Sequence, residues 1–125
     1  MTMQFLMTTK GGDAAPPSEA VHAEMAAFVE EMTRAGVLLA TGGLDPAGIR
    51  VSASGGEMTV TDGPFTEAKE AIVSFALIEV GSKEEAVELS RRFWKIIGDG
   101  AGTIQQVFGI GRAHLRKPVT EQNIE

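Results

Sequence analysis

The carboxylate best placed for chemistry is that of Asp62, which ends an alternating run of residues and precedes Gly63-Pro64. A carboxylate at a strand end, beside an open sheet face, is partly shielded from water and can act as a general base. Asp before Gly-Pro also commonly accepts hydrogen bonds from nearby backbone amides and organises the turn, and this structural role is the more frequent one. Asp62 is therefore a candidate catalytic base, and a purely structural role stays open.

The residues that follow this carboxylate are candidates for contact with a ligand. Gly63 and Pro64 are expected to shape the backbone of the loop. Phe65 is expected to pack against the domain, and it can also border a pocket. Lys69 can bind an anionic group or form a solvated ion pair with its neighbour, and the ion pair is the more common arrangement. Ser74, in the strand that follows, is a further candidate ligand contact.

Histidine, the usual general acid or base near neutral pH, occurs as His22 and His114. His22 falls at the edge of the apolar stripe of a predicted helix, where it can face a pocket but more commonly lies at the surface. Neither histidine has an Asp or Glu at ligand spacing, and the chain has no cysteine. The glycine-rich segment 98–102 follows a helix, whereas a phosphate loop precedes one. We therefore expect no metal and no other cofactor.

These candidates depend on elements within one expected domain, residues 1–125. Apolar alternation predicts strands at residues 3–9, 37–41, 49–54, 57–61, 71–80 and 103–110. Helical spacing predicts one helix capped by Ser18 and ending near Gly36, and a second that starts at Ser82 and ends at Gly98. Ser82 and Glu85 form a capping box, in which the hydroxyl and the carboxylate are expected to bind each other's free backbone amides.

The order β-α-β, hairpin, β-α-β predicts an α+β fold, a ferredoxin-like βαββαβ sandwich with both helices on one face of a four-stranded antiparallel sheet. The inserted hairpin turns at Gly55-Gly56, since both residues can take positive φ. Strand 71–80 is apolar on both faces, with Val73, Phe75 and Leu77 on one of them. Because the helices cover one face only, we expect a second copy of the sheet to cover the other, and hence a homodimer.

Composition limits the partners. With a formal net charge of −6, the chain lacks the basic face that phosphates require, so no direct nucleic-acid partner is expected. The basic cluster at residues 112–117 is interpreted as solvated, and the tail from about residue 117 as loosely ordered. No apolar run approaches the ~20 residues of a membrane span, and no signal peptide is visible. We therefore expect no membrane partner and a cytoplasmic location.

The segment from Thr61 to Glu70 reads TDGPFTEAKE and is followed by an apolar strand. Its Asp-Gly-Pro-Phe run, with Glu-x-Lys-Glu after it, resembles the signature of the DGPF branch of the YCII-related family, and the similarity runs across the chain. The resemblance implies a dimeric α/β barrel with ferredoxin-like subunits. It also implies relatives that act on small ring compounds and others that occur attached to sigma-factor-like regulators.

Several positions depart from the pattern that this resemblance implies. Gly42 stands where an acidic residue is expected, and Met25 stands roughly where the related enzymes have a histidine. Ser74 and Ala76 flank Phe75 where the family often has glycine and an aromatic residue, which implies a roomier pocket floor. A histidine–aspartate pair therefore cannot be carried over to this chain.

The sequence as a whole predicts a domain that binds an unknown small molecule, in a pocket between the sheet faces of a dimer with Asp62 at the rim. The catalytic hypothesis is proton transfer or elimination on a small cyclic compound, with Asp62 as the base. The alternative is a non-catalytic metabolite sensor or accessory domain linked to sigma-factor-type transcription regulation.

Overall fold

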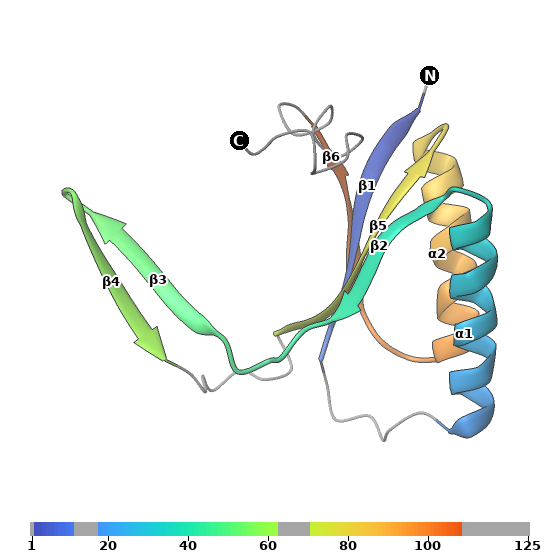
Figure 1. Ribbon diagram of the computed structural model, residues 1–125, viewed down its shortest axis with the longest axis horizontal. Coiled ribbons are helices and arrows are strands. Elements are labelled where there is room, and N and C mark those ends of the chain that lie inside the picture. The colour runs from blue at the N-terminus through green and yellow to red at the C-terminus, as the bar shows by residue number, and fades with distance from the viewer. Residues whose placement is uncertain (1, 12–17, 63–70, 109–125) are drawn as a thin grey trace, which may run out of the picture.

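The structure is a computed structural model that describes residues 2–11, 18–62 and 71–108 (Figure 1). The described residues form β1 (Met3–Lys10), α1 (Glu19–Arg34), β2 (Leu38–Gly43), β3 (Ile49–Ser54), β4 (Glu57–Asp62), β5 (Ile72–Val80), α2 (Lys83–Ile97) and β6 (Gly102–Val107). Neither of the described helices has the length and apolar character that a membrane span requires. The predicted tail and the basic cluster before it lie outside the described residues.

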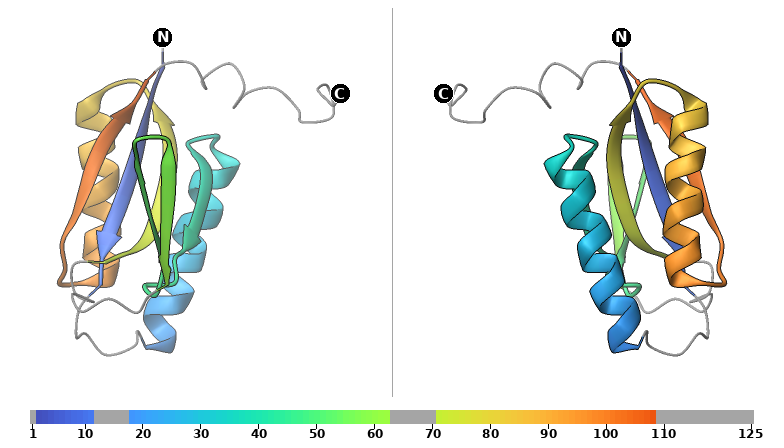
Figure 2. Two further views of the ribbon diagram at one scale, coloured as in Figure 1. Left: turned by 90° about the vertical axis from the view of Figure 1, so that its left-hand side faces the viewer. Right: turned by 90° about the vertical axis from the view of Figure 1, so that its right-hand side faces the viewer.

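Four of the strands form one antiparallel sheet in the order β2-β5-β1-β6. β1 lies between β5 and β6, so the two β-α-β halves of the chain are interleaved in a single sheet. Both helices pack on the same face of this sheet (Figure 2). Strand order and layering together confirm the predicted α+β, ferredoxin-like fold class.

Local sequence signals start both helices where predicted. The Ser18 hydroxyl accepts a hydrogen bond from the Val21 amide at 3.2 Å, and the Ser82 hydroxyl accepts one from the Glu85 amide at 3.1 Å. The Glu85 carboxylate departs from the expected capping box, because it accepts the amide of Gly81, one residue before the cap, at 2.7 Å.

The core lies on the helix-facing side of the sheet. Phe5 of β1 and Ile78 of β5 are directly paired and almost fully buried, at 3% and 1% exposure. Val80 lies on the same face two residues along β5, and Ala86 of α2 packs onto this group. The first half of α2 therefore sits on large apolar side chains of the two central strands.

The opposite face of the sheet, which we call the open face, has no second layer within the described residues (Figures 1 and 2). Val73, Phe75 and Leu77 of β5 alternate with the buried Ile78 and therefore point to this face. These three side chains are half-buried. β5 thus has apolar side chains on both faces, and the helices cover only one of these faces.

β3 and β4 form a two-stranded antiparallel hairpin outside the main sheet, which we call the arm. Its turn residues, Gly55 and Gly56, have φ values of +59° and +85°, the backbone conformation that a tight two-residue turn requires. The arm projects from the sandwich on the side of the open face, away from the helices (Figure 1). Every residue of its two strands is exposed.

One polar side chain is buried without a partner. Gln4, next to Phe5 in β1, is 2% exposed, and neither its Oε1 nor its Nε2 makes a hydrogen bond in the described part of the chain. A buried amide that loses its hydrogen bonds to water and gains none in return costs about 1–3 kcal/mol. Gln4 is therefore a local weakness of the fold.

Replacing Gln4 by methionine keeps the length of the side chain and removes both unpaired atoms. Gln4→Met is expected to raise the free energy of unfolding by about 1 kcal/mol. Urea denaturation followed by circular dichroism measures this change. The control is Gln105→Met, at an exposed strand position, which should change the free energy by less than ~0.5 kcal/mol. A Gln4→Met chain that unfolds at lower urea than the parent would contradict the prediction.

Candidate functional site

A cavity of about 320 Å³ lies between the sheet and the C-terminal half of α2. This volume is in the range of sites that bind small molecules. Six hydroxyl-bearing residues from five elements line it: Thr8, Thr9, Thr41, Ser74, Ser90 and Thr103. Of these, Thr9, Thr41 and Ser74 share the helix-facing side of the sheet, and Ser90 belongs to α2. The cavity is therefore the candidate functional site. Most of its lining belongs to the helix side of the sheet, and Thr8, Phe75 and Thr103, which share the other side, also border it.

Strand register brings two of these hydroxyls together. Thr9 of β1 pairs with Ser74 of β5, and their hydroxyl oxygens share a hydrogen bond of 2.5 Å. Both residues lie four positions from the buried pair Phe5–Ile78, so they point to the same, helix-facing side. The pairing of β1 with β5 therefore contributes the apolar pair Phe5–Ile78 to the core at one end, and the polar pair Thr9–Ser74 at the other end.

The hydroxyls of Thr41 and Ser90 differ in what they bind. Thr41 of β2 donates a hydrogen bond to the Phe75 carbonyl at 2.9 Å, which ties it to the sheet. Ser90 of α2 makes no hydrogen bond within the described residues. A hydroxyl group is both a donor and an acceptor, so Ser90 is available to a ligand in either role.

Phe93 and Trp94 of α2 form an aromatic wall of the cavity. Their rings meet edge to face, with centroids 5.1 Å apart and an interplanar angle of 81°. Trp94 also lies close to the turn after α2, where a Cβ on Gly100 would be 2.5 Å from the indole Cζ3. The missing side chain at Gly100 gives the indole its position in the wall.

A smaller cavity of about 60 Å³ lies between the two helices and the sheet. It shares Thr41, Ala76 and Phe93 with the larger cavity. Met25 of α1 lines it, at the position where the resemblance implies a histidine in related enzymes. A side chain at this position therefore faces the interior beside the candidate site, and in this chain it is apolar.

Gly42 also has a structural explanation. A Cβ at this position would lie 3.1 Å from Cε1 of Phe75, on the open face. The acidic residue expected from the family pattern would crowd the ring, because the ring already fills that space.

The described lining of the two cavities contains no acidic and no basic side chain. A serine or threonine hydroxyl needs a neighbouring base to act as a nucleophile. Within the described ranges, no group of three or more His, Asp or Glu residues could hold a metal ion. The described lining therefore places no base beside these hydroxyls.

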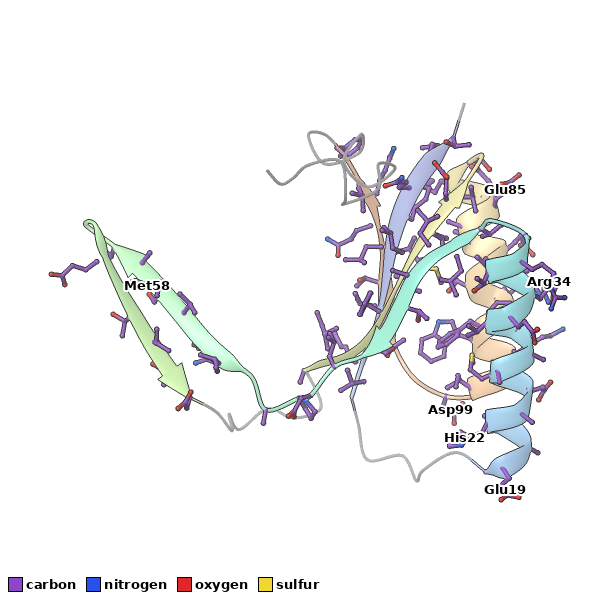
Figure 3. The ribbon with its side chains drawn as sticks, in the orientation of Figure 1. Glu19, His22, Arg34, Met58, Glu85 and Asp99 are labelled. Atoms are coloured by element: carbon purple, nitrogen blue, oxygen red, sulfur yellow. The ribbon has the colours of Figure 1, made fainter. Side chains whose placement is uncertain are left out.

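The two residues predicted to be catalytic lie away from the cavity. Asp62 ends β4, is exposed, and pairs with Ile49 across the arm. His22 is exposed near the start of α1 (Figure 3). Neither residue lines the larger or the smaller cavity.

Ser74 is the predicted ligand contact that lines the cavity, and its binding role stays a prediction. The other predicted contacts lie outside the described residues: Gly63, Pro64, Phe65 and Lys69. Sequence reasoning missed Thr9, although a hydroxyl on the apolar side of strand 3–9 was a usable signal. Its significance depends on the pairing with Ser74, which the sequence does not reveal.

An antiparallel sheet in the order β2-β5-β1-β6, two helices on one face and a cavity beneath the second helix define an α+β sandwich with a cavity between its layers. The model of the YCII-related domain matches residues 3–107, and the chain belongs to this family. The chain is also similar to an uncharacterized protein of Rhizobium meliloti (strain 1021), with 36% identity over 75 residues. That match covers 58% of this chain and 60% of the relative, less than two thirds of its length.

The contact between Gly100 and the indole can be tested directly. Gly100→Ala is expected to lower the free energy of unfolding by about 1–3 kcal/mol and to shift the emission of Trp94, because the new methyl group displaces the ring. Trp94 is the single tryptophan, so its fluorescence reports on this wall alone. Gly48→Ala is the control, since a Cβ there meets nothing within 4 Å. Equal behaviour of the two variants would show that the indole is not held at this turn.

Proposed function

We propose that the chain is a small-molecule-binding domain whose ligand occupies the cavity between the sheet and α2. The proposal is carried by one observation, six hydroxyl-bearing residues combined with the rings of Phe93 and Trp94 around about 320 Å³. Ligand sites are typically apolar cavities in which a few polar groups fix the orientation of the ligand. The combination fits a small ring compound with a hydroxyl or carbonyl group.

The lack of charge in the described lining narrows the ligand class further. An ion that leaves water without meeting an opposite charge loses much of its solvation, so a charged ligand would bind poorly here. The aromatic wall offers edge and face contacts to a planar ring. A hydroxyl or carbonyl on that ring can exchange hydrogen bonds with Ser90 in place of water. We therefore expect an uncharged compound, such as a phenol or a cyclic ketone.

We also propose that the chain belongs to the DGPF branch of its family and acts as a cytoplasmic homodimer. The assignment to the branch rests on the segment 61–70. The dimer is supported by the open face, where Val73, Phe75 and Leu77 point away from both helices. A second copy is the simplest cover, because each copy offers the same apolar face to the other.

Catalysis by Asp62 remains a hypothesis beside this proposal. The Asp62 carboxylate is exposed and does not line the cavity, so within one subunit the base and the binding site are separate. This separation favours binding without turnover. A domain that senses a metabolite for a transcription regulator needs to bind its ligand and does not need to convert it.

Filling the cavity tests the proposed site. Ala76 lines both cavities, and Ala76→Leu is expected to weaken ligand binding at least about tenfold, because its side chain takes the space of the ligand. The thermal stability should not fall, since the added carbons fill an existing void. Binding is measured by Trp94 fluorescence and by the rise in melting temperature with a panel of phenols and cyclic ketones.

Ala26→Leu, on the exposed surface of α1, is the control and should bind as the parent chain does. If no compound in the panel changes fluorescence or melting temperature, the ligand class is wrong. If Ala76→Leu binds as tightly as the parent chain, the ligand does not occupy this cavity.

Asp62→Asn separates binding from catalysis. Because Asp62 is exposed and outside the lining, the substitution is expected to leave the affinity for the best compound of the panel within about twofold. Isothermal titration calorimetry measures the affinity, with Asp45→Asn as a control for the loss of one exposed charge. A tenfold loss confined to Asp62→Asn would place the carboxylate at the ligand and favour the catalytic hypothesis.

A further inference from the structure

The arm has one largely apolar face, which no second layer covers within the described residues. Val51 pairs with Val60 and Ala53 pairs with Met58, so these side chains lie on the same side of the hairpin. Ile49 and its partner Asp62 share this side at the end of the arm away from the turn. The exposed fractions are 66% for Ile49, 57% for Val51, 66% for Met58 and 53% for Val60. Figure 3 shows Met58 on the arm, well separated from the sandwich.

The other face of the arm is polar, and it carries Arg50, Ser52, Thr59 and Thr61. Such alternation is typical of a sheet with one face in water and one face packed against protein. An isolated two-stranded hairpin is only marginally stable in water, and needs a surface to pack on. In the described chain, β3 and β4 hydrogen-bond as strands only to each other. The sequence pattern thus indicates that the apolar face of the arm packs against protein, and the described part of one subunit does not supply that surface.

We infer that the apolar face of the arm packs on the open face of a second copy of this chain, and that the arm of the second copy does the same in return. This inference rests on the homodimer of the proposed function and names the part of the chain that holds it together. Both uncovered apolar surfaces lie on the same side of the main sheet, opposite the helices (Figure 1). A twofold axis covers both at once, because each copy supplies what the other lacks.

Dimensions agree with this arrangement. Six residues at about 3.3 Å each make an arm about 20 Å long, and four strands with spacings of about 4.8 Å make a sheet about 14 Å wide. An arm can therefore cross the whole sheet of a partner. A stable interface needs roughly 800 Å² from each partner, more than one ribbon about 20 Å by 10 Å provides. Each copy must therefore contribute both its arm and its open face.

The arm of the partner is expected to pack on one end of the open face, around Thr8 and Phe75. We call this end the seat of the arm. At the opposite end Gln4 is already buried, whereas Thr103, paired with Thr8, is exposed. The arm also leaves the main sheet at this end, since Gly43, the last residue of β2, pairs near the start of β5. A twofold axis close to this end brings both arms within reach of both seats.

The test places a charge on either face of the same strand. Val60→Lys puts an ammonium group in the proposed contact and is expected to weaken self-association at least about tenfold in sedimentation equilibrium. Thr59→Lys is the matched control on the polar face, and should associate as the parent chain does. Both positions are exposed in one subunit, so neither change should affect folding, which circular dichroism checks.

The outcomes separate this inference from the homodimer itself. A parent chain that sediments at 13.2 kDa at every concentration would overturn the homodimer and the arm contact with it. A parent chain of about twice that mass, with Val60→Lys unchanged, would overturn the arm contact alone. Dissociation by Val60→Lys and not by Thr59→Lys supports it.

The seat can be located with a nitroxide label, because the chain has no cysteine of its own. Unlabelled Thr59→Cys protein carrying the nitroxide is mixed with ¹⁵N-labelled parent chain, so that only contacts between copies broaden amide signals. Broadening is expected at Thr8, Phe75 and Thr103. Broadening confined to β3 and β4 would mean that the two arms pair with each other, and would overturn the proposed seat.

Discussion

Alternation along β5 is the constraint on which the rest of the structure depends. One set of its side chains, including Ile78 and Val80, meets the helices and is buried. The other set, including Phe75 and Leu77, points to a face with no second layer among the described residues. Successive side chains of a strand point to opposite faces, so turning the strand to bury one set of side chains against the helices would expose the other set. The subunit therefore has a complete core on one side and an incomplete one on the other.

The candidate site lies along the same pair of strands, β1 and β5, at the end where their side chains become smaller. Where β1 and β5 contribute Phe5 and Ile78, the space under α2 is filled and the packing is that of a core. Four positions along, the pair Thr9–Ser74 is smaller and polar, and α2 continues above it with Ser90 and the aromatic wall. The volume that large side chains occupy at one end is left as a cavity at the other. Its walls belong to strands of the main sheet and to α2.

Membership of the YCII-related family agrees with this architecture, and the chemistry of the site must still come from the chain's own residues. Hydroxyl groups and aromatic rings select a ligand by shape and hydrogen bonding, whereas proton transfer requires a base in contact with the ligand. The interior position on α1 that could supply one holds Met25. The carboxylate of Asp62 stands on the arm, outside the described lining. Among the described residues, hydroxyl groups and aromatic rings therefore line the cavity, and the candidate base lies outside that lining.

By itself, the sequence determined the elements and their order: the caps at Ser18 and Ser82, the Gly55-Gly56 turn, and the two-sided β5 that predicts an incomplete core. These features follow from backbone conformation and periodicity, which act between residues a few positions apart. Only the tertiary structure decided that Ser74 meets Thr9, 65 positions away in the chain, and that Asp62 lies on the arm and does not line the cavity. Such contacts depend on strand register and on the direction in which the hairpin leaves the sheet, and both are set by packing between distant segments.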